Sequence, residues 1–254
     1  MKKKINAIIS GGASGLGEAT VRKILEYGGK ATILDNQENK CISLSEELGD
    51  SCSFEITDVT NELSIEKAIL NTIEKNGSIN LLVNCAGIGI PGKLIGKDSL
   101  HSSTIFEKVI KVNLLGTFNL IKYAADKMKD NIPDDENFRG VIVNTSSIAA
   151  YDGQIGQVAY SASKGGVVGL TLPLARELAK YGIRVCTIAP GLFETPMLKG
   201  LPEKAYESLL EKTLYPKRLG KPEEYAKLVL SIFENNMLNG EIIRLDGSIR
   251  LAPK

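Results

Sequence analysis

The 254-residue sequence contains a single histidine, His101, and only four cysteines. No cluster of cysteine, histidine or carboxylate residues surrounds His101, so we predict a surface-loop residue and no metal site. The cysteines stand at positions 41, 52, 85 and 186, without the paired spacing of a zinc site or a disulfide framework. Because no motif positions a histidine to make Ser147 a nucleophile, a hydrolase with a Ser-His-Asp triad is also disfavoured.

An excess of one charge and long apolar runs are lacking as well. Lysine and arginine number 31 against 30 acidic residues, a net charge of +1, which gives no reason to expect a nucleic-acid partner. No run of about 20 apolar residues suggests a membrane span, and the opening residues leave no room for a signal or transit segment. We therefore expect a cytoplasmic protein with neither a nucleic-acid nor a membrane partner.

Short apolar segments alternate with helical patterns along the whole chain, without repeats or low-complexity tracts. This alternation predicts one α/β domain over residues 1–254, a doubly wound Rossmann domain with a mostly parallel seven-stranded sheet. One long helix is expected to carry Ile110, Leu114, Phe118 and Ile121 on an apolar stripe, and a polar surface loop is expected to follow at residues 130–139. The strands are expected at residues 5–10, 31–34, 51–56, 80–83, 141–145, 184–188 and 241–245.

The most informative local pattern is Tyr160 followed four residues later by Lys164. On a helix the two side chains share a face, and an ammonium beside a phenol lowers the phenol pKa from about 10. Such a phenol can give and take protons near neutral pH. Ser147, at the end of an apolar strand, can hold a substrate oxygen. The pair alone also fits a tyrosine that anchors a helix beside a solvated lysine.

A glycine-rich turn, Gly11-x-x-x-Gly15-x-Gly17, follows the first expected strand and precedes a helix. This context is typical of dinucleotide sites, where glycines let the backbone approach a pyrophosphate at the helix N-terminus. By itself the pattern also fits a simple tight turn.

Asp35 ends the second expected strand, 18 residues after Gly17. A carboxylate there accepts hydrogen bonds from a ribose 2′-hydroxyl and repels a 2′-phosphate, and no cation follows it directly. NAD is therefore favoured over NADP, although Asp35 also fits a helix N-cap or a turn aspartate after a strand. Asp58 follows the third strand, where it can meet the adenine or cap the helix that begins near Glu62.

Taken together, these motifs resemble the short-chain dehydrogenase/reductase family over the whole chain. The matching residues are Gly11, Gly15, Gly17, Asn84-Cys85-Ala86-Gly87, Asn113, Ser147, Tyr160, Lys164 and Pro190-Gly191. The resemblance implies that Tyr160 is the general acid/base, that Ser147 orients the substrate oxygen and that Lys164 binds the nicotinamide ribose. Asn113 would hold a proton-relaying water; on spacing alone it fits a helix-packing residue equally well.

Residues 153–175, 188–197 and 238–250 are further similar to the type-2 3-hydroxyacyl-CoA dehydrogenases, also called type-10 17β-hydroxysteroid dehydrogenases. That subfamily implies an enzyme of fatty acid metabolism with NAD as cofactor, an acyl-CoA substrate and a homotetrameric assembly. Gln154 and Gln157 flank the turn before Tyr160, where each could contact the substrate or simply bond the loop. Of the two, Gln157 is expected to join Ser147 and Tyr160 as a substrate contact. By position, the cofactor contacts would be Gly11, Ser14, Gly15, Leu16, Gly17, Asp35, Asp58, Val59, Asn84, Cys85, Ala86, Gly87, Tyr160, Lys164, Pro190, Phe193 and Thr195.

Residues 89–103 and 129–139 diverge from the subfamily, and the first segment lies where its acyl-CoA would run. A 3-oxoacyl-[acyl-carrier-protein] reductase therefore stays open, with Lys93 and Lys97 as a possible basic patch, as does a steroid or secondary-alcohol dehydrogenase. A non-catalytic NAD-binding scaffold is the alternative of a different class. Residues 190–215 are rich in apolar side chains and fit either a mobile lid or an interface or core segment.

Overall fold

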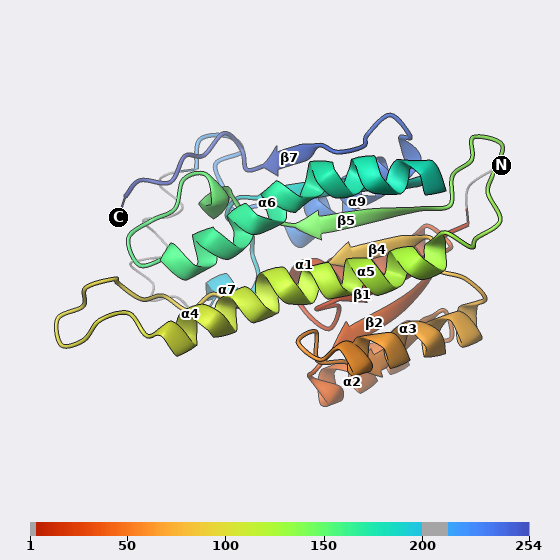
Figure 1. The fold of residues 1–254 in the computed structure, drawn as a ribbon, viewed down its shortest axis with the longest axis horizontal. Helices are drawn as coiled ribbons and strands as arrows, with labels where there is room; N and C mark the ends of the chain where they lie inside the picture. The colour runs from red at the N-terminus through yellow and green to blue at the C-terminus, as the bar shows by residue number, and fades with distance from the viewer. Residues whose placement is uncertain (1–3, 200–212, 254) are drawn as a thin grey trace.

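The computed structural model describes residues 4–199 and 213–253. Figure 1 shows one sheet with helices on both faces. Within the described residues, seven strands form the sheet in the order β3-β2-β1-β4-β5-β6-β7, and every neighbouring pair is parallel. The predicted doubly wound Rossmann fold is therefore confirmed. None of the described helices is long and apolar enough to cross a membrane.

All predicted strands are present, with boundaries shifted by at most two residues. β1, β4, β5 and β6 are buried along their whole length, which explains why they are mainly apolar in the sequence. The strands are β1 (Asn6–Ser10), β2 (Lys30–Asp35), β3 (Cys52–Ile56), β4 (Leu81–Asn84), β5 (Gly140–Thr145), β6 (Ile183–Pro190) and β7 (Ile242–Leu245).

The sheet separates two hydrophobic cores, because successive residues of a strand face opposite sides. In β1, Ile8 belongs to one core and Ile9 to the other. Helices α1 (Gly15–Glu26), α2 (Glu38–Leu48) and α9 (Pro222–Glu234) cover the Ile9 side; α3 (Glu62–Asn76), α5 (Gly116–Met128) and α6 (Val158–Leu178) cover the other. The remaining helical segments are α4 (Ser103–Ile110), π-helix η1 (Lys111–Leu115), 3-10 helices η2 (Ile148–Ala150) and η3 (Ala179–Tyr181), and α7 (Pro196–Lys199).

The apolar stripe predicted for the long helix is wrong at Phe118, whose side chain is 42% exposed. The π-helical turn η1 lies between α4 and α5 and has more residues per turn than an α-helix. Residues after it therefore face a different direction from the one that a period of 3.6 residues predicts. Leu120 and Ile121 are buried in its place.

The segment that follows β4 folds back on itself before α4 begins. Ile95 and Leu100 form an antiparallel bridge, and the backbone N–H of Gly92 donates to the oxygen of Gly156 at 2.8 Å. His101 lies in a loop, as predicted, but is half-buried with its ring over Gly92, where a Cβ would lie 2.9 Å from the ring. This segment thus joins the loop that leads into α6.

Candidate active site

The glycine turn after β1 is tightly folded against its neighbours. Gly11 and Gly15 have positive φ angles of 64° and 57°. A Cβ on Gly11 would lie 2.8 Å from the nitrogen of Ala86, and one on Gly17 would lie 2.1 Å from the oxygen of Gly11. Glycine is therefore required at these positions on steric grounds.

The N-terminus of α1 is suited to an anion. Ser14 occupies the N-cap but does not cap the helix with its side chain. Backbone N–H groups in the first helical turn have no intrahelical acceptor, and with the helix dipole they favour a phosphate. The residues present thus fit a dinucleotide pyrophosphate at Ser14 to Gly17.

Asp35 braces the glycine turn from the end of β2. Its carboxylate is 7% exposed; Oδ2 accepts a hydrogen bond from the N–H of Ala13 at 3.2 Å, and Oδ1 accepts one from the N–H of Gln37 at 3.1 Å. Gln37, and not Asp35, occupies the N-cap of α2, so the helix-cap alternative is wrong, whereas the bond from Gln37 N–H to Asp35 Oδ1 is the turn contact that the sequence also allows. The carboxylate lies beside the proposed pyrophosphate site, as a ribose-binding acid requires.

Asp58 does not cap α3, because Asn61 occupies that position and accepts from the N–H of Ser64 at 3.2 Å. Asp58 Oδ1 instead accepts from both the N–H and the hydroxyl of Thr60 at 2.8 Å, an Asx turn that fixes the loop after β3. Val59 is buried against Gly116, where a Cβ would lie 2.9 Å from Val59 Cγ2.

Asn113 clamps the backbone after β4. Its Nδ2 donates to the oxygen of Ile88 at 2.9 Å and to Ser163 Oγ at 3.0 Å, and its Oδ1 accepts from the N–H of Ile88 at 2.8 Å. A Cβ on Gly87 would lie 3.3 Å from Asn113 Oδ1 and 3.5 Å from Lys164 Nζ. These bonds hold the Asn113 side chain in place, and Gly87 lets it approach Lys164. Asn113 as the holder of a proton-relaying water stays a prediction.

Ser147, Tyr160 and Lys164 lie together at the carboxyl ends of the strands. Lys164 is 5% exposed; its Nζ donates to the backbone oxygen of Thr145 at 2.8 Å and lies 5.7 Å from the centroid of the Tyr160 ring. Ser147 Oγ accepts from the N–H of Ala149 at 3.1 Å, and Ser147 lies near enough to the Tyr160 side chain to influence its pKa. The residues of the sequence motif therefore lie close together in the folded chain.

The ionisation of this cluster differs from the sequence expectation. Burial raises the pKa of Tyr160 above 10.0, and the nearby Ser147 side chain opposes the rise. Burial likewise lowers the pKa of Lys164 to about 8. The predicted lowering of the phenol pKa is therefore wrong in direction for this structure, because desolvation is the largest influence on each group and disfavours its charged form.

The loop before α6 is held by its own amides and by the C-terminal segment. Gln157 Oε1 accepts from the N–H of Gln154 at 3.0 Å, Gln154 Nε2 donates to the oxygen of Ala252 at 3.0 Å, and the N–H of Ile155 donates to the oxygen of Pro253 at 3.0 Å. Of the two alternatives for these glutamines, the structure shows loop bonding. Gln157 as a substrate contact stays a prediction.

After β6, which ends at Pro190, the chain returns to the glycine turn. Phe193 is buried against Gly220, and a Cβ on Gly15 would lie 3.5 Å from Thr195 Cγ2. α7 begins at Pro196, as the Thr195-Pro196 pair predicts. The predicted apolar lid at residues 190–215 lies partly outside the described residues, which stop at 199 and resume at 213.

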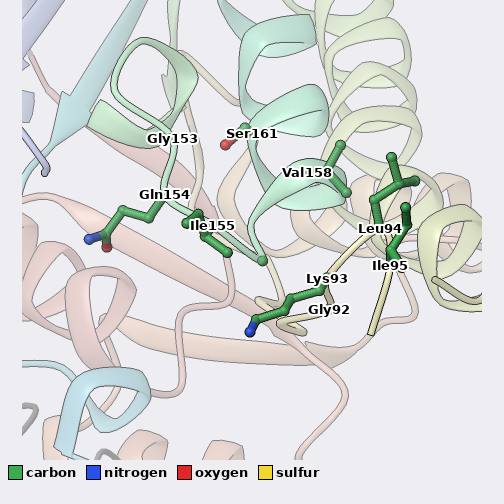
Figure 2. A pocket seen from close by; sticks show the side chains of 10 residues that line it. Gly92, Lys93, Leu94, Ile95, Gly153, Gln154, Ile155, Val158 and Ser161 are labelled. Carbon is green, nitrogen blue, oxygen red and sulfur yellow. The ribbon is translucent and has the colours of Figure 1, made fainter. Parts of the chain in front are cut away.

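A cavity of about 460 Å³ opens beside the entrance to α6. Figure 2 shows Leu94, Ile95 and Val158 on one side of it and Gln154 and Ile155 on the other. Lys93 also lines it. The cavity is therefore mainly apolar with a single cationic side chain. It joins the segment after β4 to the loop immediately before Tyr160.

The structure also shows contacts that the sequence motifs did not identify. Thr145 holds the Lys164 ammonium, Ser163 holds Asn113, and Asn144 Oδ1 accepts from Asn84 Nδ2 at 2.9 Å. The Thr145-Ser146-Ser147 run of hydroxyls was the one visible signal. No group of three histidine, cysteine or carboxylate residues suited to a metal occurs in the part of the chain that the structure describes.

A family model described as short chain dehydrogenase matches residues 5–205. The chain belongs to this family. As a short-chain dehydrogenase it is an oxidoreductase, and the resemblance inferred from Tyr160, Lys164 and the glycine turn is confirmed.

Several named proteins are similar to this chain. The 3-hydroxyacyl-CoA dehydrogenase type-2 of Bos taurus is 50% identical to this chain over 253 residues. The match covers 99% of this chain and 97% of the relative. The protein of the same name from Drosophila melanogaster is 48% identical and covers 100% of both chains. A 3-oxoacyl-[acyl-carrier-protein] reductase of Thermotoga maritima is 35% identical, covering 95% and 96%. The crystal structure of 3-hydroxyacyl-CoA dehydrogenase type-2 from Mycobacterium avium aligns with a TM-score of 0.92 at 40% identity, covering 98% and 96%.

Proposed function

We propose that this enzyme uses NAD to interconvert 3-hydroxyacyl-CoA and 3-oxoacyl-CoA thioesters, as an enzyme of fatty acid metabolism. The observation that carries the proposal is the cluster of half-buried Tyr160 with the buried side chains of Ser147 and Lys164 at the carboxyl ends of the strands. Relatives that are 48–50% identical over nearly the whole chain and are named for this substrate support the thioester assignment.

The residues present fit NAD along the edge of the sheet. The first turn of α1 would bind the pyrophosphate, Asp35 the adenosine ribose, and Lys164 the nicotinamide ribose. Asp58 and Val59 would flank the adenine, and residues 84–87 would pass close under the cofactor. Pro190, Phe193 and Thr195 would contact it from the other side. Bound NAD supplies a hydride acceptor for the carbinol carbon, and NADH returns that hydride to the ketone.

The protein residues move the proton and hold the oxygen. Ser147 would donate a hydrogen bond to the substrate oxygen, and the Tyr160 phenol would give its proton to that oxygen during reduction. During oxidation the phenolate oxygen would take the proton back. The Lys164 ammonium would stabilise that phenolate, and burial makes this assistance stronger than it would be in water.

The apolar cavity beside α6 supports an acyl substrate. Leu94, Ile95, Ile155 and Val158 offer apolar surface next to the loop that enters the Tyr160 helix. Lys93 at the same cavity is suited to a phosphate of CoA. A 3-oxoacyl-[acyl-carrier-protein] reductase is the second candidate, supported by the 35% identity to that class; the carboxylate of Asp35 opposes its usual NADPH.

The first test is the initial rate of acetoacetyl-CoA reduction, with NADH and NADPH run side by side. We expect turnover with NADH to exceed that with NADPH by at least about tenfold in kcat/KM, because the Asp35 carboxylate repels a 2′-phosphate. No turnover with acetoacetyl-CoA while NADH binds would remove the CoA thioester as substrate. Turnover of the acyl-carrier-protein thioester alone would favour the second candidate.

The double substitution Asp35→Ala with Asn36→Arg should raise the ratio of NADPH to NADH kcat/KM by about tenfold or more. The change removes a carboxylate that repels the 2′-phosphate and supplies a guanidinium that pairs with it. Asn36→Arg alone is the matched control, because it keeps the carboxylate and should shift the ratio less. An unchanged ratio in the double variant would mean that Asp35 does not select the cofactor.

We also propose a cytoplasmic homotetramer. Apolar side chains on the helical face that contains α5 and α6, among them Phe118 and Leu172, are more than one-third exposed and are suited to burial between subunits. Light scattering should then give a mass four times the 27.4 kDa of one chain; a monomer mass would contradict the assembly.

A further inference from the structure

Tyr225 lies in α9, outside every motif considered above, yet its hydroxyl reaches the catalytic edge of the sheet. The side chain is fully buried, and its oxygen lies 2.7 Å from Thr145 Oγ1. The thiol of Cys85, in the Asn84–Gly87 segment, donates to the same hydroxyl at 3.7 Å, and Thr145 Oγ1 lies 3.6 Å from the Cys85 sulfur. One tyrosine thus ties α9 to the ends of β4 and β5.

Thr145 connects this contact to Lys164. Its side chain bonds Tyr225, while its backbone oxygen accepts the hydrogen bond from Lys164 Nζ at 2.8 Å. The next residue, Ser146, donates from Oγ to the backbone oxygen of Lys164 at 2.9 Å. The Thr145-Ser146 pair therefore holds both the ammonium and the backbone of the lysine.

Lys164 depends strongly on this contact. It is almost completely buried, and within the described part of the chain the Thr145 oxygen is the acceptor within hydrogen-bond distance of its ammonium. A buried charge with few partners is sensitive to the placement of each dipole around it. A small movement of the Thr145 peptide would displace the ammonium from the ribose and from Tyr160.

We propose that Tyr225 is a positioning residue for the reaction: by fixing the Thr145 side chain, its hydroxyl sets the position of the Lys164 ammonium. This inference rests on the proposed function only for the choice of substrate, because Lys164 would contact the cofactor with any alcohol. Phenylalanine would fill the same space, so the tyrosine hydroxyl is the group whose effect on Lys164 can be isolated.

The test compares Tyr225→Phe, Thr145→Val and Thr145→Ser by NADH dissociation constant, kcat and KM. The first two variants each remove one side of the hydrogen bond and should lower kcat about five- to tenfold and weaken NADH binding about threefold, the range of one lost hydrogen bond. Their double variant should lose no more than the larger single loss, because both act through one contact. Thr145→Ser keeps the hydroxyl and should recover most of the rate lost in Thr145→Val.

Tyr123→Phe is the matched control, since that exposed hydroxyl bonds Glu62 at 3.0 Å, on the surface of the α3 and α5 layer. Its kinetics should match those of the wild type. Melting temperature is measured for every variant to separate folding from positioning. The proposal is overturned if Tyr225→Phe lowers the melting temperature while kcat and NADH affinity stay within about twofold, or if the two single losses simply add. NADH binding can be measured without any substrate. A wrong thioester assignment would therefore leave the effect of Tyr225→Phe on NADH affinity measurable.

Discussion

Replacing Tyr160 with phenylalanine should lower kcat by a factor of about 10²–10⁴, the range that one general acid/base contributes. The substitution removes only the phenolic oxygen that would exchange a proton with the substrate. The ring remains on α6, and Lys164 keeps its bond to the Thr145 oxygen at 2.8 Å. NADH should therefore bind with nearly unchanged affinity, because the phosphate and ribose contacts lie elsewhere.

Initial rates and NADH fluorescence titration on the same preparation would separate these two effects. Tyr151→Phe is a suitable control: that tyrosine lies in the turn between η2 and α6 and stacks on Arg244, with 5.2 Å from the ring centroid to the guanidinium. It should retain full turnover. Retained turnover in Tyr160→Phe would mean that another group moves the proton.

The raised pKa of Tyr160 is consistent with this role in the direction of reduction. Because burial keeps the phenol protonated at neutral pH, the proton required by the ketone oxygen is already in place. The sequence motif led us to expect a lowered pKa. Sequence spacing shows that the ammonium is near, but it does not show that both groups are desolvated, and desolvation opposes the charged form of each.

The fold was predictable because its central strands are buried on both faces. β5 and β6 are rich in apolar residues and are bounded by turn residues, so their positions could be predicted to within two residues. The ends of strands depend on pairing with neighbours, as at Pro190, which pairs with Leu245. Glycines at positions 11, 15 and 17 were informative for a similar reason: a Cβ would clash at Gly11 and Gly17, and Gly15 has the positive φ angle of 57° that favours glycine.

Features that depend on contacts between distant segments were not predictable. The exposure of Phe118 follows from the π turn at Lys111–Leu115, which a regular helical period does not anticipate. The contact of Tyr225 with Thr145 joins residues 80 positions apart. In the sequence Tyr225 is simply an apolar position of an amphipathic helix; only the packing of α9 against the sheet gives its hydroxyl a role.

Replacing Lys164 with methionine should remove most activity and also change how stability depends on pH. Burial lowers the pKa of Lys164 from 10.5 to about 8 in the folded protein. Between these two values the unfolded chain binds more protons, so the stability of the wild type rises with pH. The cost of the buried ammonium is fully present below about pH 8 and is relieved as pH rises toward 10.5. Methionine has a similar length and no such cost.

The difference in unfolding free energy between wild type and Lys164→Met should therefore move by about 2 kcal/mol in favour of the wild type between roughly pH 7 and pH 9.5. Urea unfolding at matched protein concentration would measure it. Lys122→Met is the control: its hydrogen bond with Glu62 raises the pKa of Lys122 from 10.5, so its contribution is constant below 10.5 and is lost only above that pH. A Lys164→Met difference that stays constant with pH would show that the ammonium is not destabilised in the folded state. If the difference in unfolding free energy changes with pH and turnover is lost, Lys164 is a residue that destabilises the folded protein and is needed for catalysis.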